Sequence, residues 1–281
     1  MNHKIISALL ILTLASLACG FSIDLPNAAG PDVTDEISVP APGGGETRLS
    51  LAFGAGELRL APGAEEGLVD GTVTYNIEDL KPIVEQDGSE VTIRQGNYEF
   101  KGVPTLNNIK NVWDLKLGDT PMELSLDAGA YEGQMELGGL ALTNLTIQDG
   151  AAQVKVSFAS PNAAEMSILR YETGASDVTL TGLANANFES MFFDGGAGNY
   201  ELDFSGHLQR DATISIDCGL SDLTLRVPEG VHATVTFDGG LSNVNTSSNW
   251  SRNNGSYGQD GDGPTLTFII NMGAGNLTLT H

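Results

Sequence analysis

The chain has 281 residues, 41% of them hydrophobic, and its 36 acidic and 13 basic residues give a net charge of −23 at pH 7. This hydrophobic content can build a substantial core, so we expect a folded rather than a disordered chain. An acidic surface repels phosphate backbones, so we expect no nucleic-acid partner.

The N-terminus has the features of an export signal. A short basic start, MNHK, precedes the apolar run IISALLILTLASLA, which ends at Cys19 and is too short to span a membrane. Cys19 lies in the setting of a bacterial lipidation site, although Ser16 stands where that site prefers Leu. We expect residues 1–18 to be a lipoprotein signal peptide and Cys19 to anchor the exported chain on the extracytoplasmic face of the cell membrane. An ordinary secreted protein with an incidental cysteine is the alternative.

Residues 19–46 contain Pro, Gly and acidic residues without hydrophobic periodicity. Such a composition is typical of a flexible linker. We expect a tether that holds a folded domain away from the membrane.

Residues 47–121 contain four motifs in a recognisable order. FGAGEL (53–58) is followed by the Thr-containing run GTVTYN (71–76), by LKP (80–82) and by the tryptophan run NVWDLKL (111–117). In this order the chain resembles the toast-rack domains of bacterial envelope proteins, including LiaF-like proteins of the cell-wall antibiotic response and adhesin-like families. The resemblance implies a right-handed stack of single β-coils and defines no catalytic residues. LiaF-like proteins usually carry membrane helices, whereas this chain carries an expected lipid anchor.

Residues 122–281 repeat a turn motif with a period near 22. The turn nodes are Asp127, Asp149, Glu172, Asp194, Asp217, Asp238 and Asn271. Between successive nodes lie two short runs with alternating apolar residues, such as DVTLT (177–181) and TISI (213–216), which is typical of strands. A constant period predicts a stack of two-strand coils, with two facing sheets around an aliphatic core. The predicted fold is thus an all-β, solenoid-like toast rack, and a sandwich of plain hairpins is the alternative.

The node residues have four interpretations. The side chain can cap a turn in which the glycine takes positive φ, as we expect for Asp194 and Gly196. A specific calcium loop is disfavoured because no closing ligand stands at the right distance. Stacked node acids would lie about 4.8 Å apart, so weak binding of divalent cations could relieve their repulsion. Catalysis would require clustered acids with a basic residue, and no motif of a known catalytic class is present.

Two further features remain. Cys218 alternates with Ile214 and Ile216, which predicts a small structural thiol rather than a nucleophile. The stretch 245–264 interrupts the repeat with polar residues, Trp250 and Tyr257. Exposed loop aromatics often contact sugars or proteins, so this loop is a candidate binding site, and folding back onto the stack is the alternative.

Taken together, these features predict a non-enzymatic, lipid-anchored envelope protein that binds a protein or cell-wall polymer, mediates adhesion or senses envelope stress. We expect no cofactor and no specific metal site. The alternatives are a carbohydrate-active enzyme on a β-helix and a purely structural spacer. The enzyme alternative predicts an open groove with two carboxylates about 5–10 Å apart beside a basic residue.

Overall fold

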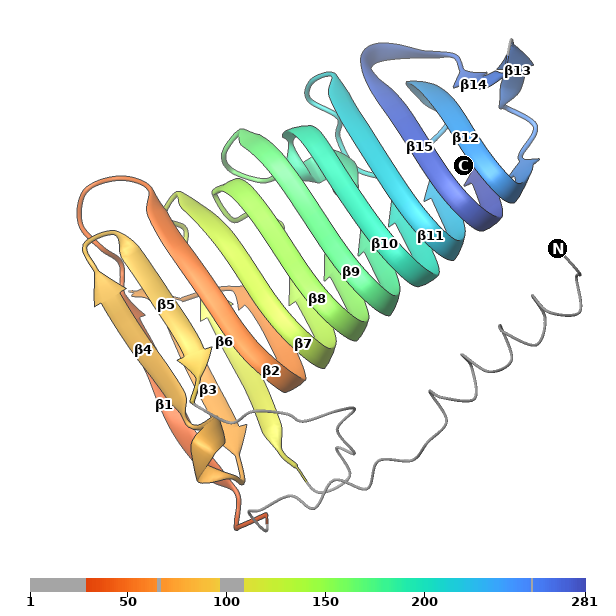
Figure 1. Cartoon of the computed structure of the whole chain (residues 1–281). Helices are drawn as coiled ribbons and strands as arrows, with labels where there is room; N and C mark the ends of the chain where they lie inside the picture. The colour runs from red at the N-terminus through yellow and green to blue at the C-terminus, as the bar shows by residue number, and fades with distance from the viewer. Residues whose placement is uncertain (1–28, 65–66, 97–108, 254) are drawn as a thin grey trace, which may run out of the picture.

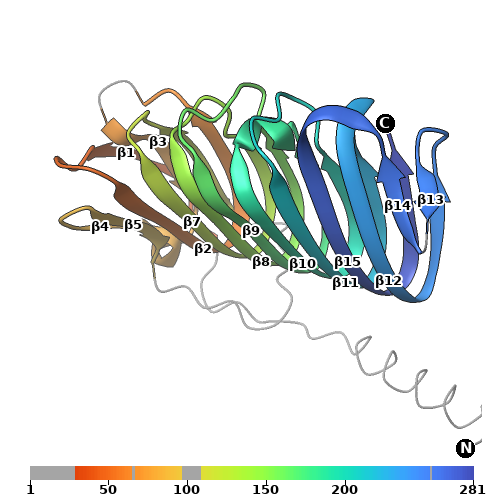
Figure 2. The same cartoon turned by 90° about the horizontal axis from the view of Figure 1, so that it is seen from above.

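The computed structural model describes residues 29–64, 67–96, 109–253 and 255–281. Figure 1 shows a long stack of strands, and Figure 2 shows the same stack from above. The elements are β1 (Val33–Pro40), β2 (Thr47–Pro62), β3 (Gly67–Tyr75), η1 (Glu78–Leu80), β4 (Pro82–Asp87), β5 (Glu90–Gln95), β6 (Asn111–Leu117), β7 (Met122–Glu136), β8 (Leu142–Ser157), β9 (Met166–Thr181), η3 (Leu183–Ala186), β10 (Phe188–Asp203), β11 (Ala212–Arg226), β12 (Gly230–Thr246), β13 (Ser251–Asn253), β14 (Ser256–Gln259) and β15 (Gly261–Thr280).

Each regular coil is one long strand that folds back on itself in the middle, as Figure 1 shows for β7 to β11. In β10, Phe193 and Tyr200 point into the core on either side of the bend, while Gly196 lies exposed at the bend itself. We call the line of these bends the ridge, the residues before it the first wall and those after it the second wall. The two expected strands per coil are therefore halves of a single bent strand, and the two facing sheets are walls of one sheet.

The sheet has 15 strands, and its main path runs β1-β3-β6-β2-β7-β8-β9-β10-β11-β15-β12-β14-β13. From β2 to β12 all neighbours along this path pair in parallel, in nearly continuous register. The stack does not follow chain order at its C-terminal end, because β15 lies between β11 and β12. The node pattern predicts the coils but not this exchange of neighbours.

The N-terminal end is less regular. Strands β5 and β6 together cover the free edge of β2, β5 along its first wall and β6 along its second. Outside them, β4 pairs antiparallel with β5, β3 pairs antiparallel with β6, and β1 pairs antiparallel with β3. The prediction that residues 19–46 form a tether throughout is wrong for residues 33–40, which form β1 and belong to the folded domain.

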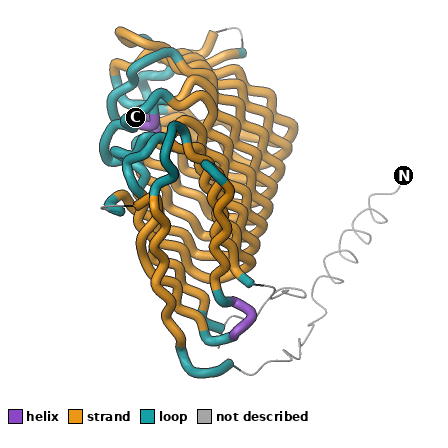
Figure 3. Tube along the Cα trace, turned by 90° about the vertical axis from the view of Figure 1, so that its left-hand side faces the viewer, coloured by secondary structure: helices purple, strands orange, loops and turns teal. Residues whose placement is uncertain are grey.

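Buried side chains from both walls form one hydrophobic cluster along the stack. Figure 3 shows the backbone of the stack from its N-terminal end. Aromatic rings meet in this cluster: Tyr171 of β9 stacks on Phe193 of the neighbouring coil β10 with ring centroids 5.5 Å apart, and within β10 the rings of Phe193 and Tyr200 meet edge to face at 5.0 Å. Such pairs contribute about 0.5–1.5 kcal/mol each beyond the burial of their surface. Among the described residues, no helix is long and apolar enough to cross a membrane.

Candidate functional site: the acidic ridge

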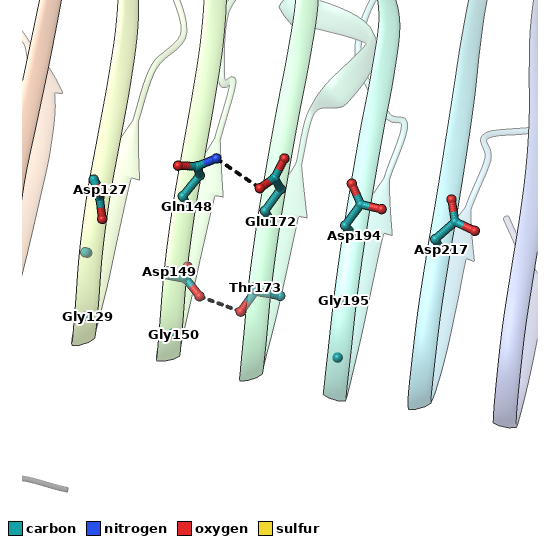
Figure 4. A pocket seen from close by; sticks show the side chains of 12 residues that line it. Asp127, Gly129, Gln148, Asp149, Gly150, Glu172, Thr173, Asp194, Gly195 and Asp217 are labelled. Atoms are coloured by element: carbon teal, nitrogen blue, oxygen red, sulfur yellow. Dashed lines mark hydrogen bonds between the residues drawn. The ribbon is translucent and has the colours of Figure 1, made fainter. Parts of the chain in front are cut away.

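A row of mostly acidic side chains runs along the first-wall side of the ridge. The strand register places one residue of each coil in this row; in spatial order they are Ala52, Asp127, Gln148, Glu172, Asp194, Asp217, Asn271 and Asp238. Figure 4 shows five of these side chains, Asp127 to Asp217, projecting from adjacent strands. Neighbouring strands lie about 4.8 Å apart, so the row is an array of charges at the spacing of a β-sheet.

The row borders two shallow, open depressions along the ridge that share Asp217, and we call the two together the groove. One part of the groove has a volume of about 790 Å³ and extends from Asp127 to Asp217. A second part of about 420 Å³ continues from Asp217 to Asp238. The acidic row forms one side, and glycines such as Gly150 and Gly196 form part of the lining. The groove can therefore offer carboxylate acceptors and bare backbone to an extended ligand.

Asp149 does not belong to this row. Its position in the row is taken by Gln148, and Asp149 lies one residue further on, paired with Ala128 and Thr173. The Asp149 carboxylate is buried and accepts hydrogen bonds from the Tyr171 hydroxyl at 2.8 Å and from the Thr173 hydroxyl. The assignment of Asp149 as a turn node equivalent to the others is thus wrong. Its carboxylate accepts hydrogen bonds that link β8 to β9 inside the bend.

The node glycines form a column at the bends of successive coils. In spatial order the column is Gly54, Gly129, Gly150, Gly174, Gly196, Gly219, Gly273 and Gly240. A Cβ atom on Gly196 would lie 2.3 Å from the carbonyl oxygen of Gly174, and one on Gly129 would lie 2.2 Å from that of Gly54. The expectation of positive φ at Gly196 is wrong, and positive φ occurs two residues later, at Gly198. Glycine is required at the column because backbones of adjacent coils approach closely there.

Amide and guanidinium groups offset part of the repulsion along the row. The Gln148 amide donates to Glu172 at 2.9 Å, and the Asn271 amide donates to Asp217 at 2.8 Å. Because β15 lies between β11 and β12, Asn271 separates the carboxylates of Asp217 and Asp238. The exchange of strand order thus places a neutral residue between two acids of the row.

At the centre of the row, Glu172, Asp194 and Asp217 remain direct neighbours. The Arg170 guanidinium lies 3.4 Å from the Glu172 carboxylate and 4.0 Å from that of Asp194. Partial burial, followed by the charges of Asp217 and Glu172, nevertheless raises the pKa of Asp194 above its ordinary value, although Arg170 opposes the shift. The folded structure therefore disfavours the charge of Asp194.

A second polar row on the far side of the ridge was missed by the sequence analysis. Asn199 donates to Asp177 at 2.7 Å, and Asn276 donates to Asp222 at 2.6 Å. Each of these residues stands five positions after a member of the acidic row, and this offset was the available signal. The alternation of Asp and Asn lets each amide satisfy a neighbouring carboxylate.

The insertion aromatics are not exposed contact groups. Trp250 is 7% and Tyr257 is 9% exposed, and both pack against the core at the C-terminal end of the stack. Tyr257 lies on β14, which pairs antiparallel with β12, and residues at both ends of the predicted insertion 245–264 belong to β12 and β15. The hypothesis of an exposed binding loop is therefore wrong, and the alternative, that the aromatics fold back onto the stack, is confirmed. Strand β14 pairs with part of the first-wall edge of β12.

Of the two cysteines, Cys218 lies within the part of the chain that the structure describes. Cys19 and the predicted signal peptide lie outside the described residues. Cys218 is a buried free thiol that stands one position after Asp217 and pairs with Gly195 of β10. Burial is the main reason that its pKa is raised to about 11, which leaves the thiol protonated at neutral pH.

Possible metal ligands do not cluster within the described part of the chain: no group of three or more His, Cys, Asp or Glu side chains there could hold a metal ion. In the central part of the row, the acids stand one per strand and share a side of the ridge. Such a linear array can attract cations without forming a coordination shell.

Comparison with known proteins places this geometry in context. A candidate cell adhesion protein from Clostridium sporogenes is similar over 89% of this chain and 99% of its own, with 19% identity and a TM-score of 0.50. A candidate lipid binding protein from Parabacteroides distasonis (12% identity, TM-score 0.32) and a candidate adhesin from Bacteroides fragilis (13%, 0.33) also match over 89% of this chain and 97% of theirs. These last two scores are too low to support an argument, and the first shows a shared fold alone. A search of curated proteins finds none that matches the chain.

The family comparison is more informative. The family model described as the N-terminal domain of toast_rack, DUF2154, matches residues 28–181. The matched region includes β1 and the first bent coils through β9, and it is more than half of the 281 residues. The bent-strand stack and this match together show that the chain belongs to the toast-rack family.

Proposed function

We propose that the chain is a non-enzymatic, lipid-anchored protein of the cell envelope that uses the ridge groove to bind a cell-wall polymer or an envelope protein. Family membership and the fold shared with a candidate cell adhesion protein fit an envelope or adhesion role. The observation that carries the proposal is the pair of open depressions along the ridge, which share Asp217 and are lined by acids from Asp127 to Asp238. Carboxylates accept hydrogen bonds from hydroxyl groups and attract amino groups, both of which extended envelope polymers can supply.

Binding of the purified protein to isolated cell walls tests this proposal. The test variant combines Glu172→Gln, Asp194→Asn and Asp217→Asn, which removes three charges from the groove. Its matched control removes three charges from exposed positions outside this groove, with the substitutions Asp87→Asn, Glu189→Gln and Asp262→Asn. We expect weakened sedimentation with cell walls for the groove variant alone. Equal binding by both variants would favour a structural spacer.

The anchor has a separate test. Cys19→Ala in the full precursor removes the expected lipid attachment site, so lipid labelling should be lost and the protein should leave the membrane fraction. Membrane association that survives this substitution, without incorporated lipid, would contradict the lipoprotein assignment. The result does not depend on whether the groove binds a ligand.

The enzyme alternative keeps one specific observation in its favour. The groove carries Glu172 and Asp194 as neighbours, Arg170 contacts both, and the pKa of Asp194 is raised, as a general acid requires. An enzyme should release reducing ends from a cell-wall polysaccharide, and Glu172→Gln should abolish that release. We expect no release from the unsubstituted protein.

Weak binding of divalent cations by the acidic row is part of the same proposal. Three acids, Glu172, Asp194 and Asp217, stand in succession, and cations near them would reduce their mutual repulsion. The melting temperature should then rise when millimolar calcium replaces EDTA. Identical melting curves would end this part of the proposal.

A further inference from the structure

The C-terminal end of the stack has a strand edge that is only half covered. Strand β12 pairs with β15 along both walls, from Gly230 to Thr246. On its other side β14 pairs only with Ala233–Thr236, in the first wall. No described strand pairs with residues 237–246 on that side, so the second wall of β12 presents unpaired backbone groups.

The core is also incompletely covered at this end. In β15, the inward-facing residues Ile270 and Leu277 are 1% and 0% exposed, whereas their partners Phe237 and Val244 in β12 are only partly buried. Leu241, at the ridge of the same strand, is 86% exposed, the highest value among the large hydrophobic residues described as exposed. Apolar surface and unpaired backbone therefore coincide on one strand.

Charge distinguishes this edge from the edges at the other end of the stack. Residues 239–246, GGLSNVNT, carry no charge in a chain of net charge −23. Both N-terminal edge strands are charged and contain proline: β1 has Asp35, Glu36 and Pro40, and β4 has Pro82, Glu85 and Asp87. Charges and prolines prevent edge-to-edge pairing, so the N-terminal edges are protected and the β12 edge is not.

We propose that a second copy of this chain pairs with residues 239–246 through the same residues, in antiparallel orientation, to form a closed two-fold dimer. The chain's own β14 already adds to the first wall of this edge in antiparallel orientation, so the edge accepts such a partner. Because the segment is uncharged, two copies can meet here without placing like charges opposite each other. Antiparallel pairing also keeps the Asp238 residues of the two copies at opposite ends of the interface.

The two-fold arrangement explains why the assembly stops at two. Within the described residues, β13 also ends the sheet, but it is only three residues long and carries Arg252, so the β12 edge is the one open to pairing, and the dimer uses this edge of both copies. Extension into a fibre would require pairing with β1 or β4, which the charges and prolines on those strands oppose. Burial of Phe237, Leu241 and Val244 supplies the apolar contact.

Analytical ultracentrifugation of the mature chain, residues 19–281 with Cys19→Ser, tests the proposal. Leu241→Lys is the test variant, and Leu220→Lys is its control, because Leu220 is 64% exposed at the same ridge position on β11. We expect a monomer–dimer equilibrium that Leu241→Lys weakens by roughly tenfold or more and that Leu220→Lys leaves unchanged. Both leucines are exposed, so both variants should fold.

Hydrogen exchange gives an independent readout. Amides of residues 239–246 should exchange faster when the unsubstituted protein is diluted below its dimerisation range, while those in β10 should not change. A monomer at all concentrations would overturn the proposal, as would open-ended oligomers or equal weakening by the two lysine variants. Dimerisation without protection of residues 239–246 would show that a partner copy docks elsewhere, and would overturn it too.

Discussion

The glycine column sets how closely the coils can stack, and Gly196→Ala is the sharpest test of it. The new Cβ atom would lie 2.3 Å from the carbonyl oxygen of Gly174. Ordinary contacts between carbon and carbonyl oxygen are about 3.3–3.6 Å, so the two strands would have to separate by about 1 Å at the ridge. Overpacking of this kind costs about 1–3 kcal/mol, and one weakened backbone hydrogen bond adds about 1 kcal/mol. The lower entropy of the unfolded alanine chain returns about 0.4–1 kcal/mol.

These contributions give a net destabilisation of about 2 kcal/mol for Gly196→Ala, or a decrease of roughly 1 M in the midpoint of urea unfolding. Gly43→Ala is the control, because a Cβ atom there meets nothing within 4 Å and φ is not in the left-handed region. The control should be neutral or slightly stabilising. A midpoint for Gly196→Ala at or above that of Gly43→Ala, measured by circular dichroism, would show that the close approach at the ridge does not limit stacking.

Two further predictions concern charges of the acidic row, and a third concerns the Cys218 thiol. The raised pKa of Asp194 means that ionisation of this side chain disfavours the folded state, so Asp194→Asn should raise the melting temperature at pH 7. This gain should disappear as the pH falls through the folded-state pKa of Asp194. A gain that persists at lower pH would contradict the prediction. Asn271→Asp should lower the melting temperature at low salt and lower it less at high salt. The substitution removes the hydrogen bond from the Asn271 amide to Asp217 and adds a repulsion between like charges of about 0.2–1 kcal/mol. A loss that does not depend on salt would argue against the charge explanation. Cys218, 7% exposed with its pKa raised to about 11, should react with a maleimide at neutral pH far more slowly in the folded protein than in urea; equal rates would show that the bend opens freely.

The sequence predicted the repeating coil because the bend requires glycine at one position, and that requirement recurs with a regular period. The position of Asp149 was less predictable. A shift of one residue moves a strand side chain from one face to the other, and the sign of it near Asp149 is that Gly150 follows directly, whereas each column glycine stands two residues after its row residue, which here is Gln148. Strand β1 was also not predicted. Its alternating pattern is short, as is usual for an edge strand, and it stands between Pro, Gly and acidic residues that are typical of a linker.

The order of coils at the C-terminal end could not be predicted from local patterns. Each coil buries the same kinds of residue, so the sequence of β15 is compatible with a place beside β12 on either side. Its actual place depends on contacts such as that between Asp217 and Asn271, which are 54 residues apart. The burial of Trp250 was equally hidden, since an aromatic residue in a polar stretch can lie outward or fold back.

The position of β15 also affects how the protein can fold. Most neighbouring coils are about 22 residues apart, as Asn199 and Asp177 are, whereas β11 and β15 are joined across 54 residues. Closing the longer loop costs roughly 0.8 kcal/mol more in chain entropy. More importantly, β12 does not pair with β11 in the native stack. Strand β15, which follows both of them in the chain, lies between them. In the native order, β12 is joined to the rest of the stack through β15, so we expect these two coils to become stable together rather than one after the other.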